Sequence, residues 1–165
     1  MKRIIIDKPK KLKKDIELTI NNTATKEIKD IDERKQIEII NQIYLGITLE
    51  NYKKVIRELN AKIQSYKTQD KKKNKYNEET IIKREELYEK FVISKLKCFY
   101  CSNPVKIVYN YIRDDFQWTL DRIDNALGHS NENTVICCLK CNLQRRVTDA
   151  KKFEFTKKLR IVKEI

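Results

Sequence analysis

The sequence predicts an α+β protein in which a basic helical region, residues 1–94, precedes a smaller mixed domain, residues 95–165. Up to Lys97, isoleucine, leucine and aromatic residues recur at the three- and four-residue spacing of amphipathic helices. From Cys98 on, cysteines, turn-forming residues and short β-prone runs replace that pattern. We place the boundary near residue 95 because the character of the chain changes there.

Three helices are expected in the N-terminal region, and the first two follow each other closely. The first runs from about Lys26 to Gly46, because isoleucines recur at helical spacing until the glycine interrupts the pattern. The second starts at Thr48, a favourable N-cap residue, and continues through Ile63. We expect the pair to form an antiparallel hairpin about the turn at residues 45–48.

Two lysine-rich segments flank this predicted hairpin. The first surrounds Pro9 and lacks apolar periodicity, so we expect an arm or an irregular segment. The second, Lys71–Lys75, breaks the helical pattern and is expected to be a solvated linker, although it could equally contact phosphates. A third helix is predicted from Asn77 toward Lys97, with acidic residues in its first turn that complement the helix dipole.

The C-terminal domain is expected to contain short strands followed by two helices. Strands are predicted at residues 105–111 and 116–120, with a turn near residues 110–115, and residues 134–136 are expected to be extended. A helix should run from Leu139 to about Arg146. A last helix is expected to start at Thr148-Asp149-Ala150, with apolar positions at Phe153, Phe155, Leu159 and Ile161.

The net charge of +13 narrows the class of partner. A surplus of this size favours a polyanion, because each neutralised phosphate releases condensed counterions. A merely soluble basic protein is the alternative. No apolar run is long enough for a membrane-spanning helix or a signal peptide. We therefore expect an intracellular protein, cytoplasmic or wherever DNA is found, with no membrane partner; nothing in the sequence indicates an oligomeric state.

The five cysteines are the strongest chemical signal in the chain. In a reducing compartment, metal binding is a better interpretation of them than disulfides. Two Cys-x-x-Cys knuckles, Cys98 with Cys101 and Cys138 with Cys141, have the spacing that lets four thiolates bind one tetrahedral zinc ion. Cys137 could replace Cys138, but it breaks the knuckle spacing, so a packed thiol is expected. A closed four-sulfur site leaves no open position and is therefore structural, and in so small a domain it would supply much of the folding free energy.

Further residues between and around the knuckles stand in a specific order. They lie in four stretches, Trp118–Asn125, Gly128-His129, Asn133–Ile136 and Cys138–Asn142. This pattern resembles the zinc-stapled members of the HNH endonuclease family, which have a ββα-metal, treble-clef-like core. The resemblance covers roughly residues 95–165 and excludes the N-terminal helices. It implies metal-dependent hydrolysis of phosphodiester bonds in nucleic acid, most readily DNA.

The resemblance also implies roles for individual residues. Asp121 matches the aspartate that binds a catalytic divalent ion, Mg²⁺ or Mn²⁺, and Asn142 matches the second ligand of that ion. Oxygen donors of this kind suit a hard cation, which would polarise the scissile phosphate. Asn133 matches the central asparagine, which orients the catalytic histidine in the family. Arg145 matches a position where a basic residue often meets phosphate, and its neighbour Arg146 is assigned to nucleic-acid binding with it.

One departure from the family pattern affects the general base. Arg122 stands where the family has its catalytic histidine, and an arginine remains protonated and cannot take a proton from water. Arg122 is therefore expected to bind phosphate. His129, the one histidine of the chain, has a pKa range suited to a general base if its loop folds back toward Asp121. The alternative is that it is a turn residue packed beside Gly128.

Three functions follow from these observations. The first is an HNH-type endonuclease, which the presence of Asp121, Asn133 and Asn142 favours. The second is a catalytically degenerate zinc module that only binds nucleic acid, which Arg122 favours. The third is a packaging or scaffold protein in which the basic helices bind nucleic acid.

Overall fold

The computed structural model describes residues 32–47, 52–109 and 113–159. Helices and a small sheet together confirm the predicted α+β class. The N-terminal arm, the start of the first predicted helix, the proposed N-cap at Thr48 and Ile161 lie outside the described residues. In chain order the elements are α1 (Glu33–Tyr44), α2 (Lys53–Lys72), α3 (Arg84–Ser94), β1 (Trp118–Arg122), β2 (Thr134–Cys138), α4 (Leu139–Arg145) and α5 (Ala150–Lys158).

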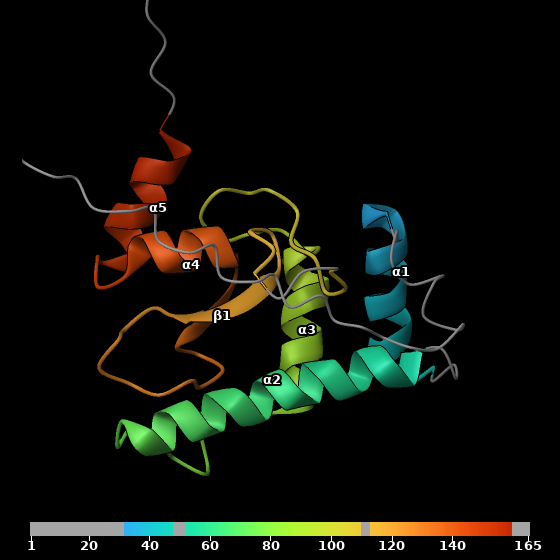
Figure 1. Cartoon of the computed structure of the whole chain (residues 1–165), viewed down its shortest axis with the longest axis horizontal. Coiled ribbons are helices and arrows are strands. Elements are labelled where there is room, and N and C mark those ends of the chain that lie inside the picture. Colours follow the sequence, from blue (N-terminus) through green and yellow to red (C-terminus); the bar gives the residue numbers. More distant parts are fainter. Residues whose placement is uncertain (1–31, 48–51, 110–112, 160–165) are drawn as a thin grey trace, which may run out of the picture.

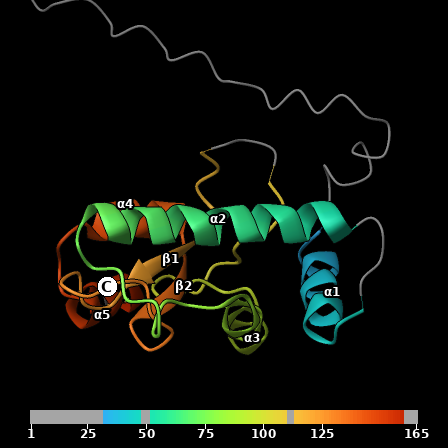
Figure 2. The same ribbon diagram turned by 90° about the horizontal axis from the view of Figure 1, so that it is seen from below.

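The long helix α2 runs along one side of the described part, with α1 at one end and α4 and α5 at the other (Figures 1 and 2). The two strands lie between these ends. None of the described helices is both long and apolar enough to cross a membrane.

The predicted antiparallel hairpin of the first two helices is wrong. Asp32 is the N-cap of α1, and its carboxylate accepts a hydrogen bond from the N–H of Lys35 at 2.8 Å. Its buried isoleucines, Ile39, Ile40 and Ile43, form an apolar stripe, and the helix packs on α3. Because α3 covers that stripe, α1 stands across the end of α2 instead of lying alongside it (Figure 1).

Helix α2 extends further than predicted, through the first two residues of the expected lysine linker. The buried positions of its inner face are Val55, Leu59, Ile63, Tyr66 and Asp70, at helical spacing to the last turn. Lys71 and Lys72 therefore lie in the last helical turn, where positive charge complements the helix dipole.

Helix α2 also contacts the edge of β1 that does not pair with β2. The ammonium group of Lys62 donates to the carbonyl of Trp118 at 2.7 Å, and the N–H of Leu120 donates to the hydroxyl of Tyr66 at 3.0 Å. Burial lowers the pKa of Lys62 to about 8. These contacts connect the N-terminal helices to the sheet.

Helix α3 begins later than predicted. The side chain of Asn77 accepts hydrogen bonds from the N–H groups of Glu79 and Thr80, which makes a local turn instead of a helix start. The helix begins after Lys83, whose N–H donates to the carboxylate of Glu86 at 2.7 Å.

The strand predicted at residues 105–111 is absent from its described part, residues 105–109. Only a single parallel bridge joins Lys106 to Gln117 there. The N–H groups of Ile107 and Val108 instead donate to the side-chain oxygen of Gln36 on α1, at 2.8 and 3.2 Å. A side chain thus satisfies backbone groups that a strand would have paired.

The sheet consists of β1 and β2, paired antiparallel with Trp118 opposite Cys138 and Arg122 opposite Thr134. Strand β1 begins two residues later than predicted, and β2 continues past Ile136 into the second knuckle. Helix α4 follows β2 directly and agrees with the prediction to within a residue. Helix α5 begins as predicted, with Asp149 as its N-cap, but Phe155 is 69 % exposed and is not a core position.

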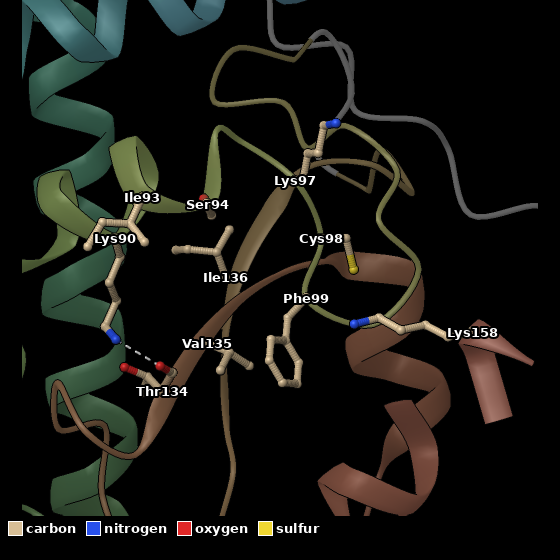
Figure 3. Close-up of a pocket in the computed structure, with 10 residues that line it drawn as sticks. All are labelled: Lys90, Ile93, Ser94, Lys97, Cys98, Phe99, Thr134, Val135, Ile136 and Lys158. Atoms are coloured by element: carbon tan, nitrogen blue, oxygen red, sulfur yellow. Dashed lines mark hydrogen bonds between the residues drawn. The ribbon is translucent and has the colours of Figure 1, made fainter. Parts of the chain in front are cut away.

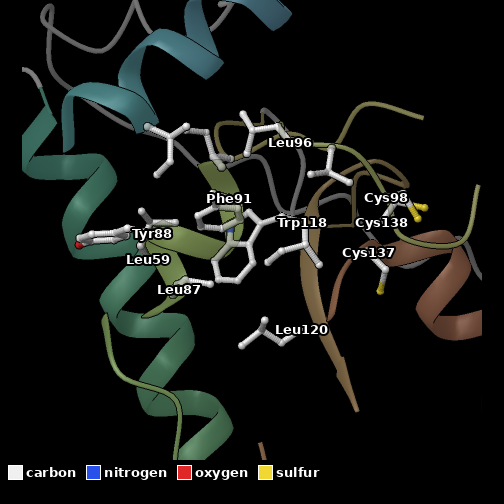
Figure 4. Close-up of a cluster of buried hydrophobic side chains, with 14 of the residues drawn as sticks. Leu59, Leu87, Tyr88, Phe91, Leu96, Cys98, Trp118, Leu120, Cys137 and Cys138 are labelled. Atoms are coloured by element: carbon white, nitrogen blue, oxygen red, sulfur yellow. The ribbon is translucent and has the colours of Figure 1, made fainter. Parts of the chain in front are cut away.

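One cluster of buried side chains includes residues from both sides of residue 95 (Figure 4). At its centre the ring of Phe91 packs edge-on against Trp118, with ring centroids 5.0 Å apart. Leu59 of α2 and Leu120 of β1 belong to the same cluster. The helices and the sheet therefore share one core in the described part of the chain.

Candidate functional site

The four cysteines of the two knuckles converge as predicted. The Sγ atoms of Cys98, Cys101, Cys138 and Cys141 all lie within 4.8 Å of one another, and those of Cys101 and Cys138 are 3.9 Å apart. Four sulfurs bound to one zinc ion at about 2.3 Å would be separated by about 3.8 Å. Among the residues that the structure describes, these cysteines are the one group of three or more His, Cys, Asp or Glu side chains placed to hold a metal ion. The donor set and its spacing fit structural zinc.

Local backbone geometry presents the two knuckles to each other. The first follows α3, whose end is marked by left-handed conformations at Lys95 and Leu96. The N–H of Phe99 then donates to the carbonyl of Ile136 at 2.9 Å, which holds this knuckle against β2. The second knuckle spans the junction of β2 and α4, where the N–H of Cys141 donates to the sulfur of Cys138.

Cys137 lies outside the cluster. Its sulfur points away from those of Cys98 and Cys138, on the opposite face of β2 (Figure 4). It is fully buried, lies 3.2 Å from the hydroxyl of Thr119, and burial raises the pKa of its thiol. The prediction of a packed thiol at Cys137 is confirmed.

A pocket of about 430 Å³ lies beside the sheet, between β1, the end of α2 and the loop after β1. We call it the cationic pocket because four of its lining residues are basic: Lys73, Lys75, Arg122 and Arg146. The predicted site residues Asp121, His129 and Asn142 also line it. Five of the predicted site residues therefore line one pocket, whereas Asn133 and Arg145 are not among its lining residues.

His129 is held by a residue that the sequence analysis missed. The carboxylate of Asp70, completely buried in the last turns of α2, accepts from the backbone N–H of His129 and bonds Nδ1 of its ring, both at 2.7 Å. The ring also packs on Tyr66, with centroids 4.7 Å apart. Burial lowers the pKa of His129 below 6.5, although Asp70 opposes that shift. This shift favours the neutral form of the imidazole.

The backbone at Gly128 lies close to Asp70 and Lys75, so a substitution at Gly128 tests how the loop that carries His129 is held. A Cβ atom at this position would lie 2.3 Å from the carbonyl oxygen of Lys75 and 3.0 Å from a carboxylate oxygen of Asp70. Gly128→Ala is therefore expected to lower the free energy of unfolding by about 1–3 kcal/mol, the usual cost of overpacking. Urea denaturation measures it. In the control Gly46→Ala the added Cβ atom would meet no other group within 4 Å, so only the strain of the positive φ at residue 46 remains. Equal losses of unfolding free energy in the two variants would contradict the steric argument.

Asn133 holds the loop that carries His129. Its side-chain amide donates to the carbonyls of Asp124 and Gly128, each at 2.9 Å, and its side-chain oxygen accepts from the N–H of Asp124. The carboxylate of Asp124 in turn accepts from the N–H of Ala126 at 2.7 Å. Asn133 thus acts on His129 through the loop backbone.

Asp121 is a buried ion-pair residue. Arg145 binds both of its carboxylate oxygens, with one contact of 2.9 Å, and the hydroxyl of Tyr100 donates to Oδ2 at 2.7 Å. Together these donors occupy most of the lone pairs of the carboxylate, and the guanidinium neutralises its charge.

The amide of Asn142 donates to the hydroxyl of Thr119 at 3.0 Å. A divalent ion shared by Asp121 and Asn142 would have to displace or compete with the Arg145 guanidinium. As they stand, these two residues do not fit such an ion.

The predicted phosphate contact at Arg145 is wrong. This side chain is 1 % exposed. Besides Asp121, its guanidinium donates to the carbonyls of Arg122 and Thr148 and to the side chain of Asn125. The buried guanidinium is therefore bonded to four residues of the protein and is not presented to a phosphate. Arg122 and Arg146 do line the cationic pocket, and a guanidinium nitrogen of Arg122 donates to the carbonyl of Leu127 at 3.2 Å.

A second pocket, of about 410 Å³, lies along the other edge of β2 (Figure 3). Its floor includes Val135 and Phe99, and Lys90 crosses it to donate to the carbonyl of Thr134 at 2.9 Å. Of the predicted site residues only Cys98 lines it. The candidate chemistry therefore belongs to the cationic pocket.

No protein-family model, curated protein or solved structure matches this chain.

Proposed function

We propose that the protein is an HNH-type endonuclease that hydrolyses phosphodiester bonds of DNA in the cationic pocket. One observation carries the proposal: a carboxylate-bonded histidine, His129, lines the same pocket as four basic side chains and Asn142. A pocket of this composition suits a phosphodiester, which presents one negative charge and needs a proton acceptor for hydrolysis.

The basic side chains support binding of the scissile phosphate. Lys73 and Arg146 are exposed at the pocket, and Lys75 is half-buried with its ammonium group on the carbonyl of Asn125. Arg122 can bind a phosphate oxygen and stabilise the charge that develops there during reaction. The surplus of positive charge over the whole chain favours the same partner.

In the proposed reaction, His129 takes a proton from water through Nε2 as the water oxygen attacks phosphorus. The bond from phosphorus to one sugar oxygen breaks, and that oxygen takes a proton from solvent. The products are a phosphomonoester and a free hydroxyl, and the imidazolium of His129 returns its proton to water. These steps use only water, His129 and the basic side chains. Mg²⁺ or Mn²⁺, which the HNH resemblance implies, remains a prediction that the pairing of Asp121 with Arg145 argues against.

The proposal predicts that the wild-type protein nicks supercoiled plasmid. His129→Ala is expected to slow nicking by about 10²- to 10⁴-fold, the usual contribution of a general base. Reactions with Mg²⁺, with Mn²⁺ and in metal-depleted buffer measure the need for a divalent ion. Asp121→Asn, which keeps the shape of the side chain, tests whether that carboxylate takes part.

Two results would count against parts of this mechanism. Nicking that survives His129→Ala but is lost in Asp121→Asn would remove His129 as the base. The control for lost charge is Lys35→Gln, an exposed lysine on α1 at the opposite end of the described part, compared with Lys73→Gln in the pocket. Equal effects of these two variants on nicking would contradict phosphate binding in the pocket.

A catalytically degenerate zinc module that only binds nucleic acid is the second candidate. The occupied carboxylate of Asp121 favours it, because the family's metal-dependent chemistry needs that group free. Duplex binding without nicking under any divalent ion would establish this alternative in place of the endonuclease.

A further inference from the structure

We infer that Asp70 is the positioning residue of His129: it fixes the imidazole in the Nδ1–H form and leaves Nε2 as the proton acceptor at the cationic pocket. This inference deepens the proposed endonuclease and rests on it for the reaction. The orientation of the ring can nevertheless be tested whether or not the protein cleaves DNA.

The geometry of Asp70 restrains His129 at two points. One carboxylate oxygen bonds the ring at Nδ1 and the other accepts from the backbone N–H of the same residue. Oδ2 of Asp70 accepts from an N–H group, and Oδ1 also lies 4.0 Å from the guanidinium of Arg122. A carboxyl group in these surroundings acts as an acceptor, so the shared proton belongs to Nδ1. With the backbone and the ring both restrained, rotation of the imidazole would break the contact with Asp70.

Nε2 is left available by this arrangement. Among the described residues none forms a hydrogen bond with it, and His129 lines the cationic pocket. A base whose far nitrogen is bonded to a carboxylate is the arrangement by which enzymes fix a histidine tautomer and stabilise the imidazolium that forms. Asp70 would therefore act on the reaction through His129 and not by touching the substrate.

The charges around His129 suit a base that starts neutral. Asp70 favours the protonated ring, whereas Arg122 and Lys73, which face it from β1 and from the residue after α2, favour the neutral ring. The ring of Tyr66 packs on one side of the imidazole. Burial has the largest effect and lowers the pKa, so the imidazole is free to accept a proton at neutral pH.

The contact also joins distant parts of the chain. Asp70 belongs to the N-terminal helical region, 59 residues before His129. The carbonyl of His129 accepts from the N–H of Ile82 at 2.8 Å, which holds the loop from the other side. The base is thus assembled from segments that lie on either side of the composition change near residue 95.

Asp70→Asn tests the inference, because asparagine keeps the shape but can donate to Nδ1 and so favour the Nε2–H form. His129 is the one histidine of the chain, so long-range ¹H–¹⁵N correlation spectra of uniformly labelled protein report on it without overlap. The wild type is expected to show the Nδ1–H tautomer at neutral pH, and Asp70→Asn the Nε2–H tautomer. The rate of nicking by Asp70→Asn should fall, by at most the roughly 10²- to 10⁴-fold that a general base contributes, with little change in KM.

The pH dependence separates positioning from a purely structural role. Because Asp70 raises the pKa of His129, its removal should lower that pKa and move the acid limb of the rate profile to lower pH. A mere loss of loop stability would not shift that limb. The control is Asp32→Asn, which makes the same change at the exposed N-cap of α1 and should leave tautomer and rate unchanged.

The outcomes distinguish this inference from the proposed function. An Nε2–H tautomer in the wild type would overturn the inference even if the protein cleaves DNA, and so would unchanged tautomer and rate in Asp70→Asn. A wild type with the Nδ1–H tautomer that cleaves nothing would overturn the endonuclease and leave the positioning of His129 standing. If Asp70→Asn fails to fold, the tautomer of the wild type still decides.

Discussion

Cys138→Ser is expected to abolish zinc binding and to unfold the part of the chain around the cysteine cluster. Structural zinc contributes roughly 10–16 kcal/mol in small zinc domains, which is comparable to the whole stability of an ordinary protein. The cluster is the point at which the end of α3, the end of β2 and the start of α4 meet. Loss of one thiolate would therefore free three segments at once.

The matched control is Cys137→Ser, the same chemical change at the neighbouring residue. Cys137 is buried beside Thr119, outside the cluster, so this variant should retain zinc and lose about 1–3 kcal/mol from a less well-satisfied buried group. Elemental analysis gives the zinc content, with one ion per chain expected for the wild type, and circular dichroism follows thermal unfolding. Equal stability of the two variants would show that the cluster holds no structural ion.

Arg145→Met is expected to destabilise the protein by about 3–5 kcal/mol, because it leaves a buried carboxylate without its partner. Asp121 would keep only the hydroxyl of Tyr100, and the carbonyls of Arg122 and Thr148 would each lose a donor. Methionine fills a similar volume, so the loss reports on charge and hydrogen bonds more than on packing.

The neighbouring Arg146 supplies the control for this prediction. It is exposed, so Arg146→Met should change the free energy of unfolding by no more than about 0.5 kcal/mol. Urea denaturation of the two variants measures the difference. If Arg145→Met were no less stable than Arg146→Met, the ion pair with Asp121 would be unimportant for the fold.

Local patterns in the sequence predicted the parts of the site that depend on local structure. The spacing within each knuckle places two thiolates on one turn, so the cysteine cluster could be predicted without knowing the fold. The helix that follows Cys138 and the N-cap at Asp149 are equally local. The strand predicted at residues 105–111 is wrong for the opposite reason. Backbone N–H groups in its described part donate to the side chain of Gln36 on α1, far away in the chain.

The cationic pocket also depends on contacts between segments far apart in the chain, which local patterns do not predict. Its residues on β1 and in the following loop were predicted, but the partner of His129 lies on α2, and nothing local joins Asp70 to it. One signal was available: Asp70 occupies the apolar stripe of α2, four residues after Tyr66, where a carboxylate must be buried and therefore needs a donor. Arg145 was assigned to phosphate because its type matched, whereas its burial depends on how α4 packs on the sheet.

The contacts of α2 with the sheet determine which fragment of the chain could be transferred to another protein with the pocket complete. A fragment that starts at residue 95 would keep all four zinc-binding cysteines and both strands. It would lack the Asp70 carboxylate that bonds His129 and the Tyr66 hydroxyl that bonds the edge of β1. It would also lack the residues of α2 and α3 that belong to the same core cluster as Trp118. A graft of that fragment onto another protein would carry the zinc site without a positioned base. The smallest portable form of the pocket therefore includes α2 and α3.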